Sequence, residues 1–365
     1  MSQSSGKRTL LTLLGIEKPI IQAPMAGVST PELAAAVSNA GGLGSLGFGG
    51  SNAERARTAI RATRALTDKP FNVNVFCHQP AQANEAVERA WTNWLAPVFE
   101  KYGATPPAAM AEINQSFLVD REMQKVLIEE KPAVVSFHFG LPPANVIAEL
   151  KQAGITLFAG ATNLDEARQV EAAGVDAIVA QGIEAGGHRG VFNPDADDRL
   201  GTFALTRLLV RSSHLPIISA GGIMDGAGIV AVLALGAQAA QLGTAFVASA
   251  ESPIDEGYRR ALLGDSARHT TFTKAISGRA ARSVVNRFTQ LGDDPRAPQT
   301  PAYPIAYDIG KALIAAAKAK GEFGYGAQWA GQAAALSRAL PAAELVAKLD
   351  EEMRACVNEM REIVI

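Results

Sequence analysis

The sequence predicts a (β/α)8 TIM barrel with a helical insertion after the third strand and a mostly helical C-terminal cap. Short, near-continuous apolar segments alternate with helical patterns, which is typical of parallel strands buried on both faces. Eight such segments occur before residue 250. The chain has 365 residues, 48% of them hydrophobic, which is ample for one large core. A doubly wound sheet is the second possibility.

The predicted strands are short apolar runs bounded by glycine, proline or polar turns. The glycine and hydroxyl residues that end the last two runs mark the points where the chain leaves the sheet. The eight runs cover residues 19–24, 43–47, 70–76, 133–139, 155–160, 175–182, 215–222 and 237–246.

The helices between these strands carry start and stop signals. Thr30 is placed to cap a helix that Gly41 ends in a left-handed conformation. Residues 52–67 have a helical pattern. Asn163 and Glu166 have the spacing of a capping box at the start of another helix.

Two segments do not fit the repeat. Residues of about 78–130 are too long for one strand-to-helix connection and are predicted to form an inserted helical excursion. Residues 251–340 are predicted to form a mostly helical cap or substrate domain, so that the barrel domain would comprise 1–250 and 341–365. The C-terminal helix is expected to dock on the barrel through one apolar stripe. That stripe is Leu345, Leu349, Met353, Cys356 and Met360.

Composition limits the classes of function. The formal net charge is −2 and there is no basic run, so neither a nucleic-acid partner nor a membrane surface is expected. Cys77 and Cys356 lie far apart, which argues against a disulfide framework or a zinc site. The apolar patch before Gly15 has only about four residues, too few for a secretory h-region or a membrane span. A soluble cytoplasmic protein is expected.

In a barrel the active site lies where the strands end, so the residues that follow each strand are the candidates. These are Pro24 and Met25 after the first strand, Asn74 in the third, His138 at the end of the fourth, Gln181 and later His188 after the sixth, Gly221 and Gly222 after the seventh, and Gln241, Leu242, Gly243 and Thr244 at the end of the eighth.

The glycines after the last two strands suggest a phosphate site. Bare backbone N–H groups at Gly221–Gly222 and Gln241–Thr244 can surround a phosphate, although one glycine pair alone would equally fit a tight turn. A phosphate there belongs to a sugar phosphate or to a flavin mononucleotide. The neutral amides of Asn74 and Gln181 suit the polar edge of an isoalloxazine ring and favour the flavin. No paired carboxylates occur at strand ends and no metal is expected; Glu184 is expected to be solvated or structural.

The run AQGIEAGGHRG, residues 180–190, is the least regular of these connections. Its glycines, including Gly186, carry a large ordering cost in a helix or strand and would let a flat ligand lie against the backbone. His188 in this loop is predicted to be functional, as a ring donor or a base. His138 is predicted to contact substrate, with a hydrogen-bonded core histidine as the alternative. Arg189 either holds the loop or attracts an anion.

A further group is predicted in the cap segment TPAYPIAYDIGKAL. Tyr303, Tyr307 and Lys311 are four residues apart and would share one face of a helix that starts near Pro304. That face would present two phenols and an ammonium group to the barrel rim. An ordinary amphipathic helix with a snorkelling lysine is an equally good interpretation.

Several of these stretches together resemble the nitronate monooxygenases, formerly called 2-nitropropane dioxygenases. The resemblance runs from about Gln22 to Phe246 and continues more loosely to QWAGQ, residues 328–332. Single motifs such as SAGGI are shared by other flavin barrels, but the ordered set is specific. The stretches that carry it are QAPMAGVSTPELAAAVSNAGGLGSLG, FNVNVFCH, VVSFHFG, AQGIEAGGHRG, ISAGGIMDG and AQLGTAF.

The resemblance implies an FMN-dependent enzyme that oxidises alkyl nitronates such as propionate 3-nitronate with O2 to a carbonyl compound plus nitrite and some nitrate. It implies that His188 lies beside flavin and substrate, where it would orient the nitronate, balance its charge or act as a base. A monomer or a homodimer is expected. Segment 108–115 lacks a tyrosine expected in close relatives. Implied substrate contacts are His138, Tyr303, Tyr307 and Lys311; implied FMN contacts are Pro24, Met25, Asn74, Gln181, Gly186, Gly222 and Gln241 to Thr244.

Three other functions remain open at this point. An FMN-dependent NAD(P)H reductase, acting on enoyl-ACP or a quinone, has similar glycine pairs. A flavin-free barrel lyase or isomerase of a phosphorylated substrate is less favoured, and a non-catalytic binding protein least. The glycine-rich run at 41–50 surrounds a short strand and does not form a G-x-G-x-x-G motif, although barrel reductases can bind NADH otherwise.

Overall fold

The computed structural model describes residues 9–364 and contains the predicted barrel. Eight parallel strands lie in the order β1-β9-β8-β6-β5-β4-β3-β2. A parallel bridge between Ile21 and Leu43 joins the two outer strands β1 and β2, so the sheet closes on itself. The strands are β1 (Ile20–Gln22), β2 (Gly44–Gly47), β3 (Phe71–Phe76), β4 (Val134–His138), β5 (Thr156–Ala161), β6 (Ala177–Gln181), β8 (Ile217–Ala220) and β9 (Ala239–Leu242).

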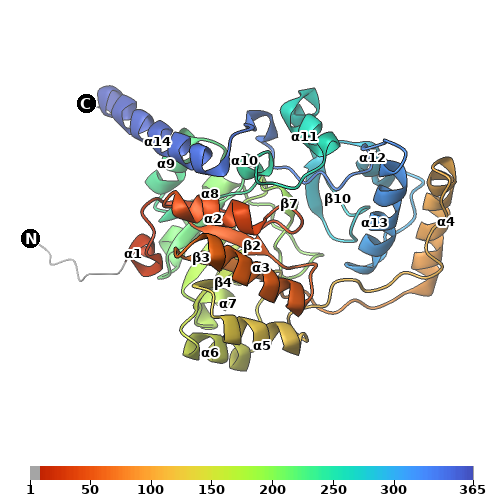
Figure 1. The fold of residues 1–365 in the computed structure, drawn as a ribbon, viewed down its shortest axis with the longest axis horizontal. Helices are drawn as coiled ribbons and strands as arrows, with labels where there is room; N and C mark the ends of the chain where they lie inside the picture. The colour runs from red at the N-terminus through yellow and green to blue at the C-terminus, as the bar shows by residue number, and fades with distance from the viewer. Residues whose placement is uncertain (1–8, 365) are drawn as a thin grey trace, which may run out of the picture.

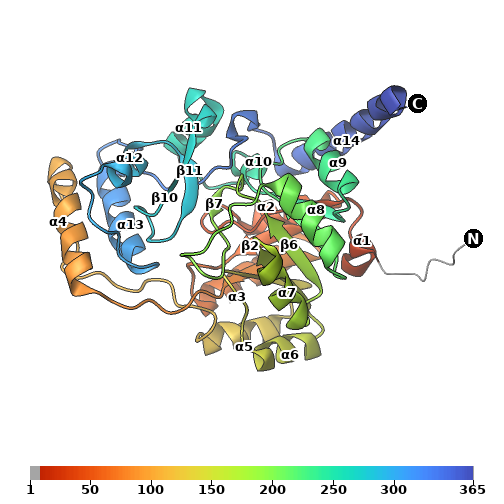
Figure 2. The same ribbon diagram turned by 180° about the vertical axis from the view of Figure 1, so that it is seen from behind.

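Helices surround the barrel on the outside (Figures 1 and 2). Seven of them follow strands directly or after an insertion; the last position is taken by the C-terminal helix, which packs against α9 and α2. The helices are α2 (Pro31–Asn39), α3 (Ala53–Leu66), α5 (Arg121–Glu130), α6 (Ala144–Gln152), α7 (Leu164–Ala172), α8 (Thr202–Ser212), α9 (Gly226–Ala234) and α14 (Ala342–Val364).

The predicted capping signals operate, with one difference. Thr30 Oγ1 accepts a hydrogen bond from the N–H of Leu33, and Gly41 follows α2 with a φ of +91°. Asn163 caps α7 by accepting from the N–H of Glu166. The second half of that capping box is not made, because the carboxylate of Glu166 instead accepts from the N–H and hydroxyl of Thr162.

The apolar patch near the start of the chain forms the short helix α1 (Leu10–Leu14). Leu10 and Leu14 are buried and pack with the inward-facing barrel residues Ile21, Val134 and Phe158. The patch therefore closes the amino-terminal end of the barrel. Residues 1–8 of the same predicted segment lie outside the described part.

The inserted segment and the cap pack together. Helix α4 (Glu85–Lys101) lies beside α13 (Ile305–Lys318), and both views show the two at the same end of the molecule (Figures 1 and 2). Trp91 and Phe99 of α4 share a core with residues of α13. Helix α5, at the end of the predicted insertion, instead packs on the barrel through Met123 and Leu127. The excursion away from the barrel is thus the stretch before α5.

The cap contains the predicted helices and also a small sheet that the sequence did not predict. Strand β11 (Ala281–Val284) lies between β10 (Thr270–Thr273) and β7 (Gly187–His188), and both pairings are antiparallel. Part of the loop 180–190 is therefore a strand that joins the barrel to the cap. The other cap elements are α11 (Glu256–Leu263), α12 (Arg287–Asp293), and the short 3-10 helices at Asp265–Arg268 and Ala334–Leu336, while the short helix α10 (Thr244–Val247) follows β9 in the barrel part.

Helix α14 docks through the first part of its predicted stripe. Leu345, Leu349 and Met353 are buried, Cys356 is partly buried, and Met360 is 44% exposed because the helix extends beyond the barrel at that point (Figure 1). Within residues 9–364, no helix combines the length and the hydropathy needed to cross a membrane.

Candidate functional site

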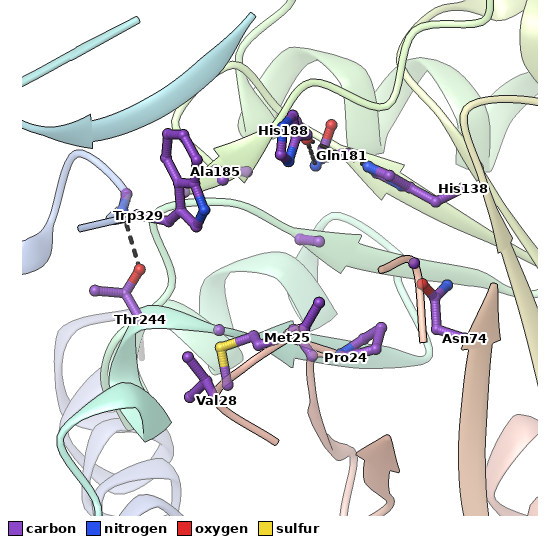
Figure 3. A pocket seen from close by; sticks show the side chains of 18 of the residues that line it. Pro24, Met25, Val28, Asn74, His138, Gln181, Ala185, His188, Thr244 and Trp329 are labelled. Carbon is purple, nitrogen blue, oxygen red and sulfur yellow. Dashed lines mark hydrogen bonds between the residues drawn. The ribbon is translucent and has the colours of Figure 1, made fainter. Parts of the chain in front are cut away.

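A deep cavity of about 380 Å³ lies at the carboxyl ends of the barrel strands, between the barrel and the cap. This volume is in the range of small-molecule sites, roughly 300–1,000 Å³. His188 and His138 lie on one side of it and Pro24 and Met25 on the other (Figure 3). The predicted residues that line the cavity are Pro24, Met25, Asn74, His138, Gln181, Gly186, His188, Gly221, Gly222, Gln241, Gly243, Thr244, Tyr303, Tyr307 and Lys311.

Leu242 is the one predicted residue outside this lining. Its side chain is 1% exposed and packs in a core cluster with Ile20 and Phe246. The reason is strand alternation: neighbouring side chains of β9 point to opposite faces, so Gln241 faces the cavity and Leu242 does not.

Backbone N–H groups gather where β8 and β9 end. Gly221 and Gly222 have φ values of +120° and +70°, a conformation that glycine adopts without strain. Gly243 precedes the short helix α10, of which Thr244 is the first residue. Within the described residues, the N–H groups of Gly222, Gly243 and Thr244 donate to no protein acceptor. They are therefore available to an anion, as a phosphate site requires.

The two predicted amides are used differently. Asn74 donates its Nδ2 to Ser136, at 3.0 Å from the carbonyl and 2.9 Å from the hydroxyl oxygen, and its Oδ1 has no protein partner among residues 9–364. Gln181 is committed to the loop: its Nε2 donates to the carbonyl of His188 (3.1 Å) and its Oε1 accepts from the N–H of Gly190 (2.7 Å). Asn74 can still accept from a ligand, whereas Gln181 chiefly shapes the wall.

Arg189 holds the loop. Its side chain is 2% exposed and forms a two-fold hydrogen-bonded ion pair with Asp197, at 2.9 and 2.8 Å, while a third donor reaches the carbonyl of Gln181. Burial favours the neutral acid, but the hydrogen bonds and charges of Arg189 and Arg199 together outweigh it and keep the pKa of Asp197 below its usual value. Glu184 is also structural, because its carboxylate accepts from the N–H and hydroxyl of Thr202 at the start of α8.

Position 186 requires glycine because the backbone of the loop and the backbone of the cap approach each other there. A Cβ on Gly186 would lie 2.6 Å from the nitrogen of Gly331 in the cap. Gly187 has a φ of +72° and more open space. The loop glycines thus serve the contact between barrel and cap as well as the cavity wall.

His188 and His138 are both uncharged at neutral pH. Burial, then the charges of His138, Arg279 and His78, lower the pKa of His188 to about 3. Burial, then Arg279, lowers the pKa of His138 to about 4. Nε2 of His188 lies 2.8 Å from Ser277 Oγ, and Nε2 of His138 lies 3.3 Å from the carbonyl oxygen of His188. An imidazole in this state orients or accepts, but it brings no positive charge.

Tyr307 and Lys311 lie on α13 and reach the cavity as predicted, whereas Tyr303 lines the cavity from the segment before the helix, which begins at Ile305. Tyr303 is 8% exposed and its hydroxyl has no protein partner in the described chain. Tyr307 lies next to it, and the Lys311 ammonium is 4.8 Å from the Tyr307 ring centre. Lys311 remains exposed as a residue, so it lies at the mouth, and burial shifts its pKa downward. Two neutral phenols and one cation thus face the site from the cap.

Several lining or supporting residues were not predicted, since they lie in segments that are not strand ends. The Trp329 ring centre is 5.2 Å from that of His188, within the QWAGQ stretch quoted above. Ser277 and Arg279 lie in the turn between β10 and β11, and Asn114 comes from the insertion. Only an expected antiparallel hairpin at 270–284 could have drawn attention to that turn. In residues 9–364, no group of three His, Cys, Asp or Glu side chains is arranged to hold a metal.

Comparison with known proteins gives consistent results. Residues 7–352 match the family model described as nitronate monooxygenase. A nitronate monooxygenase of Paraburkholderia phytofirmans is 74% identical over 363 residues, which is 99% of both chains. Among solved structures, a nitroalkane oxidase from Streptomyces ansochromogenes has a TM-score of 0.88 at 40% identity and covers 96% of this chain and 99% of its own. FabK from Thermotoga maritima has a TM-score of 0.74 at 33% identity and covers 98% and 100%.

Proposed function

The chain belongs to the nitronate monooxygenase family, and from this premise we propose that it binds FMN and uses O2 to oxidise alkyl nitronates. The products would be a carbonyl compound plus nitrite and some nitrate, and propionate 3-nitronate is the substrate to try first. The observation that carries this proposal is one cavity with two unlike ends. Unpartnered backbone N–H groups lie at the barrel end, and phenols with an ammonium group lie at the cap end.

The residues present fit FMN. The N–H groups of Gly222, Gly243 and Thr244 would hold the phosphate, as bare backbone at such a rim commonly does. Asn74 keeps an acceptor for the polar edge of the flavin ring. Met25 and Pro24 supply an apolar surface opposite His188 (Figure 3). When bound, the flavin supplies the electron-accepting group that a protein side chain lacks.

The cap residues would bind and orient the nitronate. A nitronate is already an anion, so the site needs a cation and hydrogen-bond donors more than a strong acid or base. Lys311 offers the cation, and the Tyr303 hydroxyl is an unpartnered buried donor that a nitronate oxygen would satisfy. Trp329 and the buried Phe139 surround His188 and exclude water from that part of the cavity.

An oxygen-uptake assay tests the proposal. The purified protein is mixed with preformed nitronates and, separately, with the parent nitroalkanes, and nitrite is measured in the same samples. Oxygen uptake with nitrite release from nitronates supports the function. Extraction of FMN from the protein supports the cofactor. A colourless protein that consumes no oxygen would favour the flavin-free lyase or isomerase instead.

A reductase is the second candidate, because the similarity to FabK covers 98% of this chain. In the glycine-rich run after α2, Gly44 serves packing: a Cβ there would lie 1.9 Å from the carbonyl oxygen of Ala34, so this glycine lets α2 pack against β2. Rapid anaerobic bleaching of the flavin by NADH, but not by a nitronate, would favour the reductase.

A further inference from the structure

We infer that the cap turn carrying Ser277 and Arg279 fixes the form in which His188 faces the substrate. That form is an uncharged imidazole with its proton on Nε2 and an accepting lone pair on Nδ1. Ser277 and Arg279 act through His188 and are positioning residues. The catalytic consequence rests on the proposed function; the state of the ring does not.

The hydrogen-bond partners of Ser277 determine the tautomer of His188. Ser277 is fully buried, and its Oγ lies 2.8 Å from His188 Nε2 and 3.2 Å from the carbonyl oxygen of Arg279. A carbonyl only accepts, so the single hydroxyl hydrogen of Ser277 goes to Arg279. The hydroxyl oxygen then accepts from Nε2, which must carry the ring proton.

The other ring nitrogen is left for a ligand. His188 lines the cavity, and its Nδ1 makes no hydrogen bond to protein within residues 9–364. The backbone carbonyl of His188 accepts from His138 and from Gln181, which fixes the chain on the other side of the ring. The imidazole is thus held at Nε2 and its backbone at the carbonyl oxygen, with Nδ1 left as an acceptor for a ligand.

Burial is the main cause that keeps that ring uncharged, and the charge of Arg279 adds to it. Arg279 is 6% exposed and has no carboxylate within 4 Å in the described chain. Its nearest partners are the carbonyl of Val191 and the Phe139 ring, whose centre is 4.0 Å away. A buried cation without a counter-ion is costly, and its field opposes a second positive charge nearby. Protonation of His188 is therefore disfavoured from the cap side.

Glu166 supports the charge of Arg279 from a distance, but among residues 9–364 no negatively charged group faces the His188 ring. His78 and His138 are held neutral by burial, which lowers the pKa of each to about 4, and the phenols stay protonated because burial raises their pKa values. An anion that enters the cavity supplies the missing negative charge. The titratable and charged groups that face the ring are His78, His138, Arg279, Tyr303, Tyr307 and, at the mouth, Lys311.

Ring nitrogen NMR tests the inference directly. The holoenzyme is labelled with ¹⁵N-histidine, the five histidines give few signals, and a His188→Asn variant identifies the one of interest. We expect His188 to be neutral with its proton on Nε2 at pH 7, and to remain so down to pH 5. A protonated ring, or a proton on Nδ1, would overturn the inference whatever substrate the enzyme uses.

Two variants separate positioning from mere packing. Ser277→Ala removes the acceptor, so the Nε2 signal should shift and kcat/KM should fall about 10-fold or more. Ser283→Ala is the matched control, because Ser283 is equally buried in β11 but bonds to Gln328. Unchanged His188 signals in Ser277→Ala would contradict the role of Ser277.

Arg279→Gln removes the charge and should raise the His188 pKa measurably, with Arg279→Lys restoring the wild-type value. If Arg279→Gln does not fold, the Ser277→Ala variant and the pH titration of His188 in the wild-type protein decide the inference. Normal His188 signals in a protein without nitronate oxidation would leave this inference standing and refute the proposed function.

Discussion

The two walls of the cavity are built from different materials. The barrel wall offers backbone N–H groups and amides, and its buried cation Arg189 is neutralised by Asp197 at 2.8 Å. The cap wall offers phenols and Lys311, and the buried Arg279 of the cap, outside the cavity lining, forms no ion pair with a carboxylate in the described chain. The contrast suggests a division of labour in which the barrel holds a cofactor and the cap binds an anionic substrate.

The largest expected effect is on the barrel wall. Gly243→Val places a side chain among the free N–H groups, yet a Cβ there meets only Ala23 and Met25 at 3.5 and 3.7 Å, an ordinary contact. The protein should therefore fold but lose its flavin and nearly all activity. Flavin absorbance and circular dichroism of the purified variant check this. A yellow, active Gly243→Val protein would place the phosphate elsewhere.

His188→Asn tests the role of His188, which lies between the barrel wall and the cap wall. Flavin should stay bound, because the phosphate groups are untouched, while kcat/KM with propionate 3-nitronate should fall about 100-fold, the usual scale for a positioned acid or base group. Steady-state oxygen uptake measures it. Unchanged kinetics would remove His188 from the mechanism.

Lys311→Met changes the cap wall only. The variant loses the cation at the mouth, so KM for an anionic nitronate should rise about 10-fold with flavin content and kcat nearly unchanged. Lys318→Met on the same helix is the control, since Lys318 pairs with Asp255 outside the cavity lining. A fall in kcat without a change in KM would assign Lys311 another role.

Asp197→Asn tests the neutralised arginine of the barrel wall. The variant leaves Arg189 without its counter-ion and should lose about 1–3 kcal/mol of unfolding free energy at pH 7. Because the folded-state pKa of Asp197 is depressed, the wild-type contribution is present above the unfolded pKa and disappears as the pH falls through the folded value. Denaturant titrations at pH 7 and pH 3 should therefore differ less for Asp197→Asn than for wild type.

The smallest effect concerns pH. The pKa of His188 is lowered to about 3 and that of His138 to about 4, so neither ring titrates between pH 6 and pH 8. With preformed nitronate, kcat/KM should show no inflection in this range. A fall in kcat/KM as the pH rises through about 6.5, the ordinary histidine pKa, would show that a histidine works in its charged form.

The sequence predicted the barrel wall well because strand ends are local features. Apolar runs mark the eight barrel strands, and parallel strands bring their carboxyl ends to one rim. Leu242 differs from its predicted neighbours because alternation along β9 turns its side chain into the core. The confirmed capping residues Thr30 and Asn163 show the same locality.

The cap wall was predicted only in part. Tyr307 and Lys311 followed from helical spacing, which is also local, whereas Tyr303 lines the cavity from outside the helix. Ser277, Arg279 and Trp329 are brought to His188 by β7 pairing with β11, a contact between residues about ninety positions apart that no short pattern reveals. The same pairing explains why the glycine loop 180–190 is partly a strand.

A crystal structure of the flavin-loaded enzyme tests the central claim most directly. We predict the FMN phosphate within hydrogen-bond distance of the N–H groups of Gly222, Gly243 and Thr244, and the flavin ring between Met25 and His188. A phosphate bound away from the ends of β8 and β9, or a ring outside this cavity, would contradict the account.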